Sequence, residues 1–394
     1  MTTPSTLSTP LPVTDGPRFH FFGYYDKSPW DVSGRFLLAQ ETGFMDRRPG
    51  PEDVADIGVV DTQDGNSWRK LSETQAWNWQ QGCMLQWVPG SEDEIIFNVR
   101  QGDRFQAQVL NTRTNEMRHL SQPIYGVSPA GREAISLNFS RLFDVRPGYG
   151  YAGAPDPWAD NICPEDDGLY HVDLETGDSR LIFSLADALR LGEPQPGMET
   201  GKHRFNHVQW NTDGTRFAVL HRWSIVPSPA NWSSWATRLL TLNADGTDPH
   251  VLSDHTMISH YDWRDPQTVL AWARRHDVGD RYFLFTDKTP ETTIVGDGIL
   301  TVDGHCSYSP DRRWILTDTY PDKEGYRTLL LFDPKSERRI DIGRFHGPTP
   351  SDGEIRCDLH PRWSRDGRQI CIDSIHENGH RQIYTIDVSS ITTA

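Results

Sequence analysis

The amino-acid sequence predicts an all-β protein, a seven-bladed β-propeller, and two observations carry this prediction. A unit made of a short apolar strand, a polar turn and a second strand recurs seven times along the 394 residues. Each unit is followed by another strand that ends in a polar turn. Strands of about five residues at regular spacing are typical of all-β proteins. Repeats of about 40 to 60 residues that cannot bury their apolar faces alone stack into a propeller.

The seven units follow one another along most of the chain. Their hairpins are SPWDVSGRFLLAQ from Ser28, QWVPGSEDEIIFNV from Gln86, VSPAGREAISLNF from Val127, QWNTDGTRFAVLH from Gln209, DWRDPQTVLAW from Asp262, YSPDRRWILTDT from Tyr308 and RWSRDGRQICIDS from Arg362. The strands that follow end in turns such as DTQDG and NADGT. Gly, Asp, Asn and Pro are the residues that reverse a chain between strands, so the turns support the hairpin assignment.

One domain accounts for the repeats. We expect the polar, Pro/Thr-rich residues 1–17 to form a disordered tail and residues 18–394 to form a single propeller. The longest interval between hairpins carries two insertions, at about 141–167 and 185–205, with one short helix at 185–192. Long insertions on a rigid scaffold usually serve binding. A packing flap or a dimer contact is the alternative role.

Composition restricts the partners and the compartment. A formal net charge of -16 argues against nucleic acid, because phosphate binding needs a basic face. No stretch approaches the roughly 20 apolar residues of a membrane span, so we expect no membrane contact. The start of the chain lacks the basic and apolar regions of a secretory signal, and the five cysteines are odd in number and scattered. We therefore expect a cytoplasmic protein with reduced cysteines.

Four consecutive units carry a histidine at the same place. It lies three residues before the aromatic residue that opens the hairpin: His207 in HVQW, His260 in HYDW, His305 in HCSY and His360 in HPRW. The first strand of a propeller blade lines the central channel, so four equivalent imidazoles converge there. Neutral imidazole is the commonest metal ligand, and Cys306 and Cys357 lie beside two of the four. We expect a divalent metal, zinc or manganese; the alternatives are histidines that only bridge strands and cysteines that only pack.

A second group of ionisable residues surrounds His207. Arg204 precedes it, and LHRW supplies His221 and Arg222 at the far end of the same hairpin. Around a cleft such residues offer a cation for a carboxylate and a base with a pKa near neutrality; a solvated basic face is the alternative. Tryptophans in predicted loops suit stacking on the apolar faces of sugars; they are Trp77, Trp79, Trp158, Trp232 and Trp235.

These motifs resemble the β-propeller polysaccharide lyases. The chain is similar to the oligogalacturonate lyases at HVQW, VLHRW, HYDW, HCSYSPD and DLHPRW, and more loosely to the seven-bladed ulvan lyases at RPGYGYAG. The first resemblance implies a manganese site with His260, His360 and His305 as ligands, and His207 or His221 as the base. Where that family has a Gln and two His near the last blade, this chain has Ile355, Asp358 and His360. The second resemblance implies that Tyr149 or Tyr151 transfers a proton.

The activity that these resemblances imply is β-elimination on an acidic, uronate-containing oligosaccharide, which makes the protein a carbon–oxygen lyase. The site must neutralise the uronate carboxylate, and Arg204 or Arg222 fits that task. A non-catalytic propeller that binds glycan or protein is one alternative. A glycoside hydrolase on the same scaffold is another; it requires paired carboxylates, for which the candidates are Asp166, Asp167 and Asp262.

Overall fold

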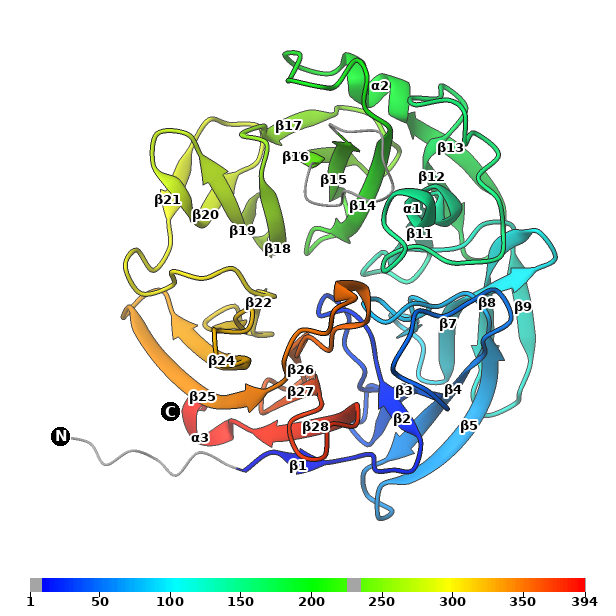
Figure 1. The fold of residues 1–394 in the computed structure, drawn as a ribbon, viewed down its shortest axis with the longest axis vertical. Coiled ribbons are helices and arrows are strands. Elements are labelled where there is room, and N and C mark those ends of the chain that lie inside the picture. Colours follow the sequence, from blue (N-terminus) through cyan, green and yellow to red (C-terminus); the bar gives the residue numbers. More distant parts are fainter. Residues whose placement is uncertain (1–8, 225–234, 394) are drawn as a thin grey trace.

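The computed structural model describes residues 9–224 and 235–393, and its architecture confirms the predicted seven-bladed propeller (Figure 1). Seven four-stranded antiparallel sheets, the blades, surround a central axis. The first three blades are β2 (Phe19–Phe21), β3 (Phe36–Thr42), β4 (Ala55–Asp61), β5 (Ser67–Thr74); β6 (Gln86–Trp87), β7 (Glu94–Gln101), β8 (Arg104–Asn111), β9 (Met117–Leu120); and β10 (Gly126–Val127), β11 (Glu133–Ser136), β12 (Gly168–Asp173), β13 (Ser179–Ser184).

The other four blades follow the same order from the channel outward. They are β14 (His203–Trp210), β15 (Arg216–Ser224), β16 (Trp235–Asn243), β17 (His250–Ser253); β18 (Ile258–Asp265), β19 (Thr268–Arg275), β20 (Gly279–Thr286), β21 (Thr292–Ile294); β22 (Ser307–Tyr308), β23 (Ile315–Thr317), β24 (Tyr326–Asp333), β25 (Arg338–His346); and β26 (Arg362–Trp363), β27 (Gln369–Ser374), β28 (Gln382–Asp387), β1 (Leu11–Pro12). Apolar residues of the middle strands are buried between neighbouring blades. Side chains of a strand point alternately to its two faces, and both faces of each blade pack against other sheets.

The last blade takes its outer strand from the beginning of the chain. Leu11 and Pro12 form β1, which pairs antiparallel with Thr385 and Tyr384 of β28, and Figure 1 shows β1 beside β28 in the last blade. The prediction of a disordered tail over 1–17 is therefore wrong for these residues. An outer strand needs backbone hydrogen bonds more than apolar side chains, so the polar composition of this segment did not reveal it.

The two insertions contain helices. α2 (Leu185–Arg190) lies within the predicted short helix and begins with a capping box between Ser184 and Asp187, which satisfies backbone N–H groups at the helix start. α1 (Phe139–Val145), capped by Asn138, was not predicted. A one-turn α3 (Ser389–Thr392) ends the described chain, and no helix among the described residues is long and apolar enough to cross a membrane.

A buried arginine fastens the first insertion to the propeller. Arg141 forms an ion pair with Asp156, with Nη1 3.1 Å from Oδ2 and both side chains almost fully buried. Its other N–H groups donate to backbone oxygens of His203, Asn161 and Ile162. A guanidinium that satisfies several loop carbonyls at once fixes the loop against the strand that carries His207.

Candidate active site

The four histidines of the repeated motif come together in the central channel, as their equivalent positions predict. The ring centroids of His260 and His305 are 4.1 Å apart, and those of His305 and His360 are 4.4 Å apart. His207 lies on the other side of Tyr24, whose ring stacks on His207 at 4.9 Å and packs edge-on against His360 at 5.0 Å. All four imidazoles are buried.

Backbone conformation turns two of these side chains toward the axis. His207 and His360 have φ values of 55° and 41°, in the left-handed region that non-glycine residues rarely adopt. Met84, at the equivalent place in the second blade, has φ 57°. Because a methionine shares this backbone conformation, the conformation belongs to the start of the inner strands of this propeller and does not depend on a histidine side chain.

A metal-binding geometry exists at the last two blades. His305, Asp358 and His360 each offer a ligand atom, and these atoms all lie within 4.8 Å of one another. The Nε2 atoms of His305 and His360 are buried without a hydrogen-bond partner in the described chain. Nδ1 of His305 faces the carboxylate of Asp318 at 2.9 and 3.0 Å, which orients a metal-ligating imidazole. Two imidazoles and a carboxylate fit a divalent cation such as manganese or zinc.

Asp358 is held in place by two arginines. Arg327 donates from Nη2 to Oδ1 at 3.1 Å, and Arg356 donates from Nε to Oδ2 at 2.5 Å. Burial opposes ionisation, but the two guanidinium groups outweigh it and hold the pKa of Asp358 well below its usual range. The carboxylate is therefore ionised at any working pH, as a metal ligand must be.

The two cysteines predicted as ligands, Cys306 and Cys357, are not part of this cluster. Among the residues that the structure describes, the cluster of ligand atoms contains no thiol. Cys306 packs among Tyr308 and Ile315, because neighbouring residues of an extended strand point to opposite faces and His305 takes the channel face. Sγ of Cys357 contacts the backbone oxygen of Asp358 at 4.0 Å. Burial raises the pKa of Cys357 to about 11, so the thiol stays protonated and binds metal poorly.

His260 also lies outside the three-residue cluster, although it was predicted to be a ligand. Its Nδ1 lies 3.0 Å from Oδ1 of Asp303 and 3.1 Å from Oγ of Ser259. Burial and the neighbouring His305 lower its pKa, so it is a neutral imidazole at neutral pH. It lines the adjoining cavity instead.

This adjoining cavity, the channel cavity, has a volume of about 180 Å³. Its wall combines cations, imidazoles and phenols: Arg146, Arg222, His207, His260, Tyr149 and Tyr320, with Trp235 beside them. No described residue that lines it is Asp or Glu. The three aspartates considered for a hydrolase, Asp166, Asp167 and Asp262, lie elsewhere; Asp262 accepts hydrogen bonds from Gln209 and from the backbone of Tyr308.

Three arginines place unpaired N–H groups around the channel cavity. Arg204 and Arg222 are directly opposite each other on β14 and β15, and the guanidinium carbons of Arg146, Arg204 and Arg222 lie 4.7, 5.6 and 5.9 Å from the ring centroid of Trp235. Within the described chain, Nε of Arg146, Nε and Nη2 of Arg204 and Nη1 of Arg222 are buried without partners. Arg146 also forms a long ion pair, with Nε 4.0 Å from Oε1 of Glu354.

The electrostatics of the arginines indicate an anion site. Burial and the charge of Arg222 push the pKa of Arg204 well below its ordinary value. Burial and Arg146 lower the pKa of Arg222 to about 10. Buried charges are normally paired because desolvation without a partner is costly, so this cluster is suited to bind an anion such as a carboxylate.

The structure separates the two histidines predicted as alternative bases. His221 uses both ring nitrogens inside the blade: Nε2 lies 2.8 Å from Nδ1 of His203, and Nδ1 accepts from Nε of Arg238 at 3.0 Å. His203 in turn donates to the backbone oxygen of Met198. In His207 only Nδ1 is engaged among the described residues, 3.1 Å from Oη of Tyr125 and 3.2 Å from Nε2 of Gln81. His207 is therefore the one that presents a ring edge to the cavity.

The two tyrosines separate in the same way. Tyr149 lines the channel cavity, and its Oη accepts from Nη2 of Arg356 at 3.1 Å, while Arg146 lies over its ring at 4.1 Å. Tyr151 is buried in the core, stacks on Phe139 at 4.4 Å and accepts from Nδ2 of Asn98 at 3.1 Å. Tyr149 is therefore the one whose position in the cavity lining allows it to exchange a proton with a ligand.

The tryptophans predicted to stack on sugars divide between core and cavities. Trp77 and Trp79 are buried and donate their indole N–H groups to backbone oxygens, so they stabilise the fold. Trp235 borders the channel cavity and Trp158 borders a different one. Trp232 lies outside the described residues.

Sequence reasoning assigned no role to three contributors to this site. Arg146 is the first residue of the quoted RPGYGYAG loop and could have been singled out there as a cation. Asp358 was noted as a departure from a resembling family. Tyr320 lies in the connection between β23 and β24, and no repeated sequence pattern indicates that it faces the cavity.

Comparisons with known proteins agree with this fold. No protein-family profile matches the chain, and neither does any curated protein sequence. Among solved structures, the chain resembles an oligogalacturonate lyase in complex with manganese, with a TM-score of 0.66, 15% identity and coverage of 97% of this chain and 94% of that chain. An oligogalacturonate lyase from Vibrio parahaemolyticus has a TM-score of 0.66, 13% identity and coverage of 98% and 96%.

Other propellers resemble the chain as well. The β-propeller domain of the Trilobed protease from Pyrococcus furiosus matches with a TM-score of 0.55, 10% identity and coverage of 95% of each chain. The class that fold and comparisons define is the seven-bladed β-propeller. Within that class, the chain is similar in fold to the two oligogalacturonate lyases.

Proposed function

We propose that this protein is a lyase that cleaves uronate-containing oligosaccharides by β-elimination. The observation that carries the proposal is the channel cavity, where unpaired arginine N–H groups, neutral histidines and an arginine-bound tyrosine meet without a described carboxylate in the lining. The similarity to an oligogalacturonate lyase in complex with manganese supports the same reaction class.

The first requirement of the reaction is a place for the uronate carboxylate. Arg222, with Arg146 beside it, would bind that group through its free Nη1. Neutralising the carboxylate makes the adjacent C5 proton more acidic, because the negative charge that develops in the transition state is stabilised. Arg204 lies behind Arg222 on the neighbouring strand and adds positive potential.

The second requirement is a base and an acid. Burial, with the positive charge of Arg222, holds the pKa of His207 well below its ordinary value, so its imidazole is neutral and can accept the C5 proton at neutral pH. As the C4–O bond breaks and the C4–C5 double bond forms, Tyr149 gives a proton to the leaving oxygen. Arg356, which donates to Oη of Tyr149, stabilises the resulting phenolate.

The third component is the cluster of His305, His360 and Asp358, which would hold a manganese or zinc ion. These residues would hold the ion beside the channel histidines, where it would supply additional positive charge. We also place the protein in the cytoplasm. Its five cysteines are all free, and four of them are buried, which supports a reducing compartment.

The experiment is an absorbance assay on acidic oligosaccharides. Purified protein without a His-tag, supplied with manganese or zinc, is incubated with oligomers of galacturonate, glucuronate and mannuronate. The expected result is an unsaturated product that absorbs in the ultraviolet, lost in Arg222→Gln. New reducing ends without absorbance would show hydrolysis, and binding without turnover would show a non-catalytic propeller; either result overturns the proposal.

A further inference from the structure

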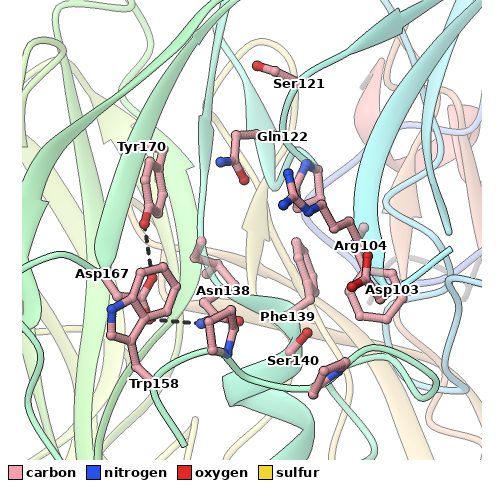
Figure 2. A pocket seen from close by; sticks show the side chains of 15 residues that line it. Asp103, Arg104, Ser121, Gln122, Asn138, Phe139, Ser140, Trp158, Asp167 and Tyr170 are labelled. Carbon is pink, nitrogen blue, oxygen red and sulfur yellow. Dashed lines mark hydrogen bonds between the residues drawn. The ribbon is translucent and has the colours of Figure 1, made fainter. Parts of the chain in front are cut away.

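A second cavity, the rim pocket, lies between the second and third blades, apart from the channel (Figure 2). Its volume is about 290 Å³. It is formed by the β7–β8 turn, the connection after β9, the first insertion and the start of β12. No lining residue is shared with the channel cavity, so the function proposed above leaves this pocket unexplained.

The rim pocket has a buried carboxylate at its wall. Asp167 is 1% exposed, and it accepts from Nδ2 of Asn138 at 2.9 Å and from Oη of Tyr170 at 3.2 Å (Figure 2). Arg141, the nearby cation, is committed to Asp156 and to loop carbonyls. Burial raises the pKa of Asp167 to about 6. A carboxylate can accept about four hydrogen bonds, so Asp167 has capacity for further donors from a ligand.

An aromatic side chain is fixed at the mouth of the same pocket. Trp158 is partly exposed and lines the pocket together with Asp167 (Figure 2). Its backbone N–H donates to Oδ1 of Asp156 at 3.0 Å, and its carbonyl accepts from Nη1 of Arg141 at 3.1 Å. A buried ion pair thus holds the loop that carries the indole, which reduces the ordering that a ligand must impose.

We propose that the rim pocket binds one neutral, hydroxyl-rich sugar unit. The apolar face of a pyranose would stack on Trp158, as aromatic side chains favour, while its hydroxyl groups would donate to Asp167 and bond with Asn138 and Gln122. Asp103 and Asp167 line the pocket together with one cation, Arg104, so its lining carries a net negative charge that disfavours a uronate. The volume lies near the lower end of small-ligand pockets, about 300 Å³, which suits a single ring.

The test is saturation-transfer NMR on the full chain with methyl glycosides of galactose, glucose, rhamnose and xylose, and with galacturonate as the acidic comparison. At least one neutral glycoside is expected to bind. Trp158→Ala should weaken it up to about tenfold, the equivalent of one stacked aromatic contact. Asp160→Asn, an exposed carboxylate of the same insertion outside the pocket, and Arg222→Gln, in the channel cavity, should leave this binding unchanged.

A second variant, Asp167→Asn, tests the carboxylate separately and should also weaken binding, with circular dichroism confirming that both variants fold. Absence of saturation transfer from every neutral glycoside would overturn the proposal. An affinity for the neutral glycoside that is unchanged in Trp158→Ala would also overturn it, as would galacturonate binding that Trp158→Ala weakens. Arg222→Gln changes the channel cavity and not the rim pocket. Glycoside binding to the rim pocket can therefore be measured and interpreted even if the protein proves not to be a lyase.

Discussion

Replacing Arg222 with glutamine should stabilise the free protein while it abolishes activity. Burial and Arg146 lower the pKa of Arg222 from 12.5 to about 10, which corresponds to about 3 kcal/mol against folding with the charge in place. The pKa of Arg222 is lower in the folded state than in the unfolded state, so folding is penalised wherever the folded side chain is charged. The penalty is therefore fully present at pH 7 and fades only above about pH 10, the folded-state pKa.

Two favourable contacts of Arg222 reduce the gain. Its Nε donates to Oγ1 of Thr237 at 3.1 Å, a hydrogen bond worth about 1 kcal/mol. Its guanidinium lies 5.9 Å from the centroid of Trp235, a contact worth about 0.5 to 1 kcal/mol. The net expectation for Arg222→Gln is an increase of about 1 kcal/mol in the free energy of unfolding.

The assay is urea denaturation at pH 7, with galacturonate absent and present. Galacturonate should stabilise the wild type and not the variant, because ligand binding to the folded state adds to stability. The matched control is Arg327→Gln, a buried arginine that is paired with Asp358 and whose loss should cost about 3 to 5 kcal/mol. The anion site is refuted if Arg222→Gln destabilises the protein as Arg327→Gln does and galacturonate stabilises the wild type and Arg222→Gln equally.

Further predictions concern the base, the acid and the metal. His207→Ala should lower kcat by about 10² to 10⁴-fold in steady-state kinetics, whereas His221→Ala should mainly lower the free energy of unfolding in urea titration. A large loss of kcat in His221→Ala and none in His207→Ala would show that the assignment is wrong. Because the pKa of His207 is lowered, kcat/KM should stay constant from neutral pH to below pH 6.5, and a pH profile that falls near 6.5 would contradict this. Tyr149→Phe should lower kcat with little change in unfolding, and an unchanged kcat would exclude it as the acid. Elemental mass spectrometry should find about one metal ion per chain in the wild type, less in His360→Ala and an unchanged amount in Cys357→Ala; loss in the cysteine variant would restore the thiol as a ligand.

The sequence alone was sufficient to predict the blades and the convergence of the histidines. Both follow from a pattern that repeats, because equivalent positions of equivalent blades face one axis. The sequence could not show which of the residues adjacent to a histidine also faces that axis. Cys357 and Asp358 are adjacent in sequence, but only Asp358 has a ligand atom in the cluster with His305 and His360.

Residues outside the repeats were harder to place. Tyr149 and Tyr151 are two positions apart in one loop, and only the structure shows that Arg356 contacts the first while Phe139 packs against the second. Similarly, His207 and His221 lie on one hairpin. His221 is engaged by His203 of that hairpin and by Arg238 of β16, whereas the partners of His207 come from earlier in the chain, at Gln81 and Tyr125. Contacts between distant segments decide these roles, and no local spacing encodes them.

The closure of the ring by β1 has a consequence for the order in which the site can form. Tyr24 comes from the first blade, whereas His360 and Asp358 come from the last, and Arg362 joins the two by donating to the backbone oxygen of Gly23 at 2.7 Å. A nascent chain on the ribosome therefore has no complete channel until its final blade has been made and has captured residues 11–12. A metal ion held by His305, His360 and Asp358 would therefore bind only after synthesis, once the two-residue strand β1 has closed the ring.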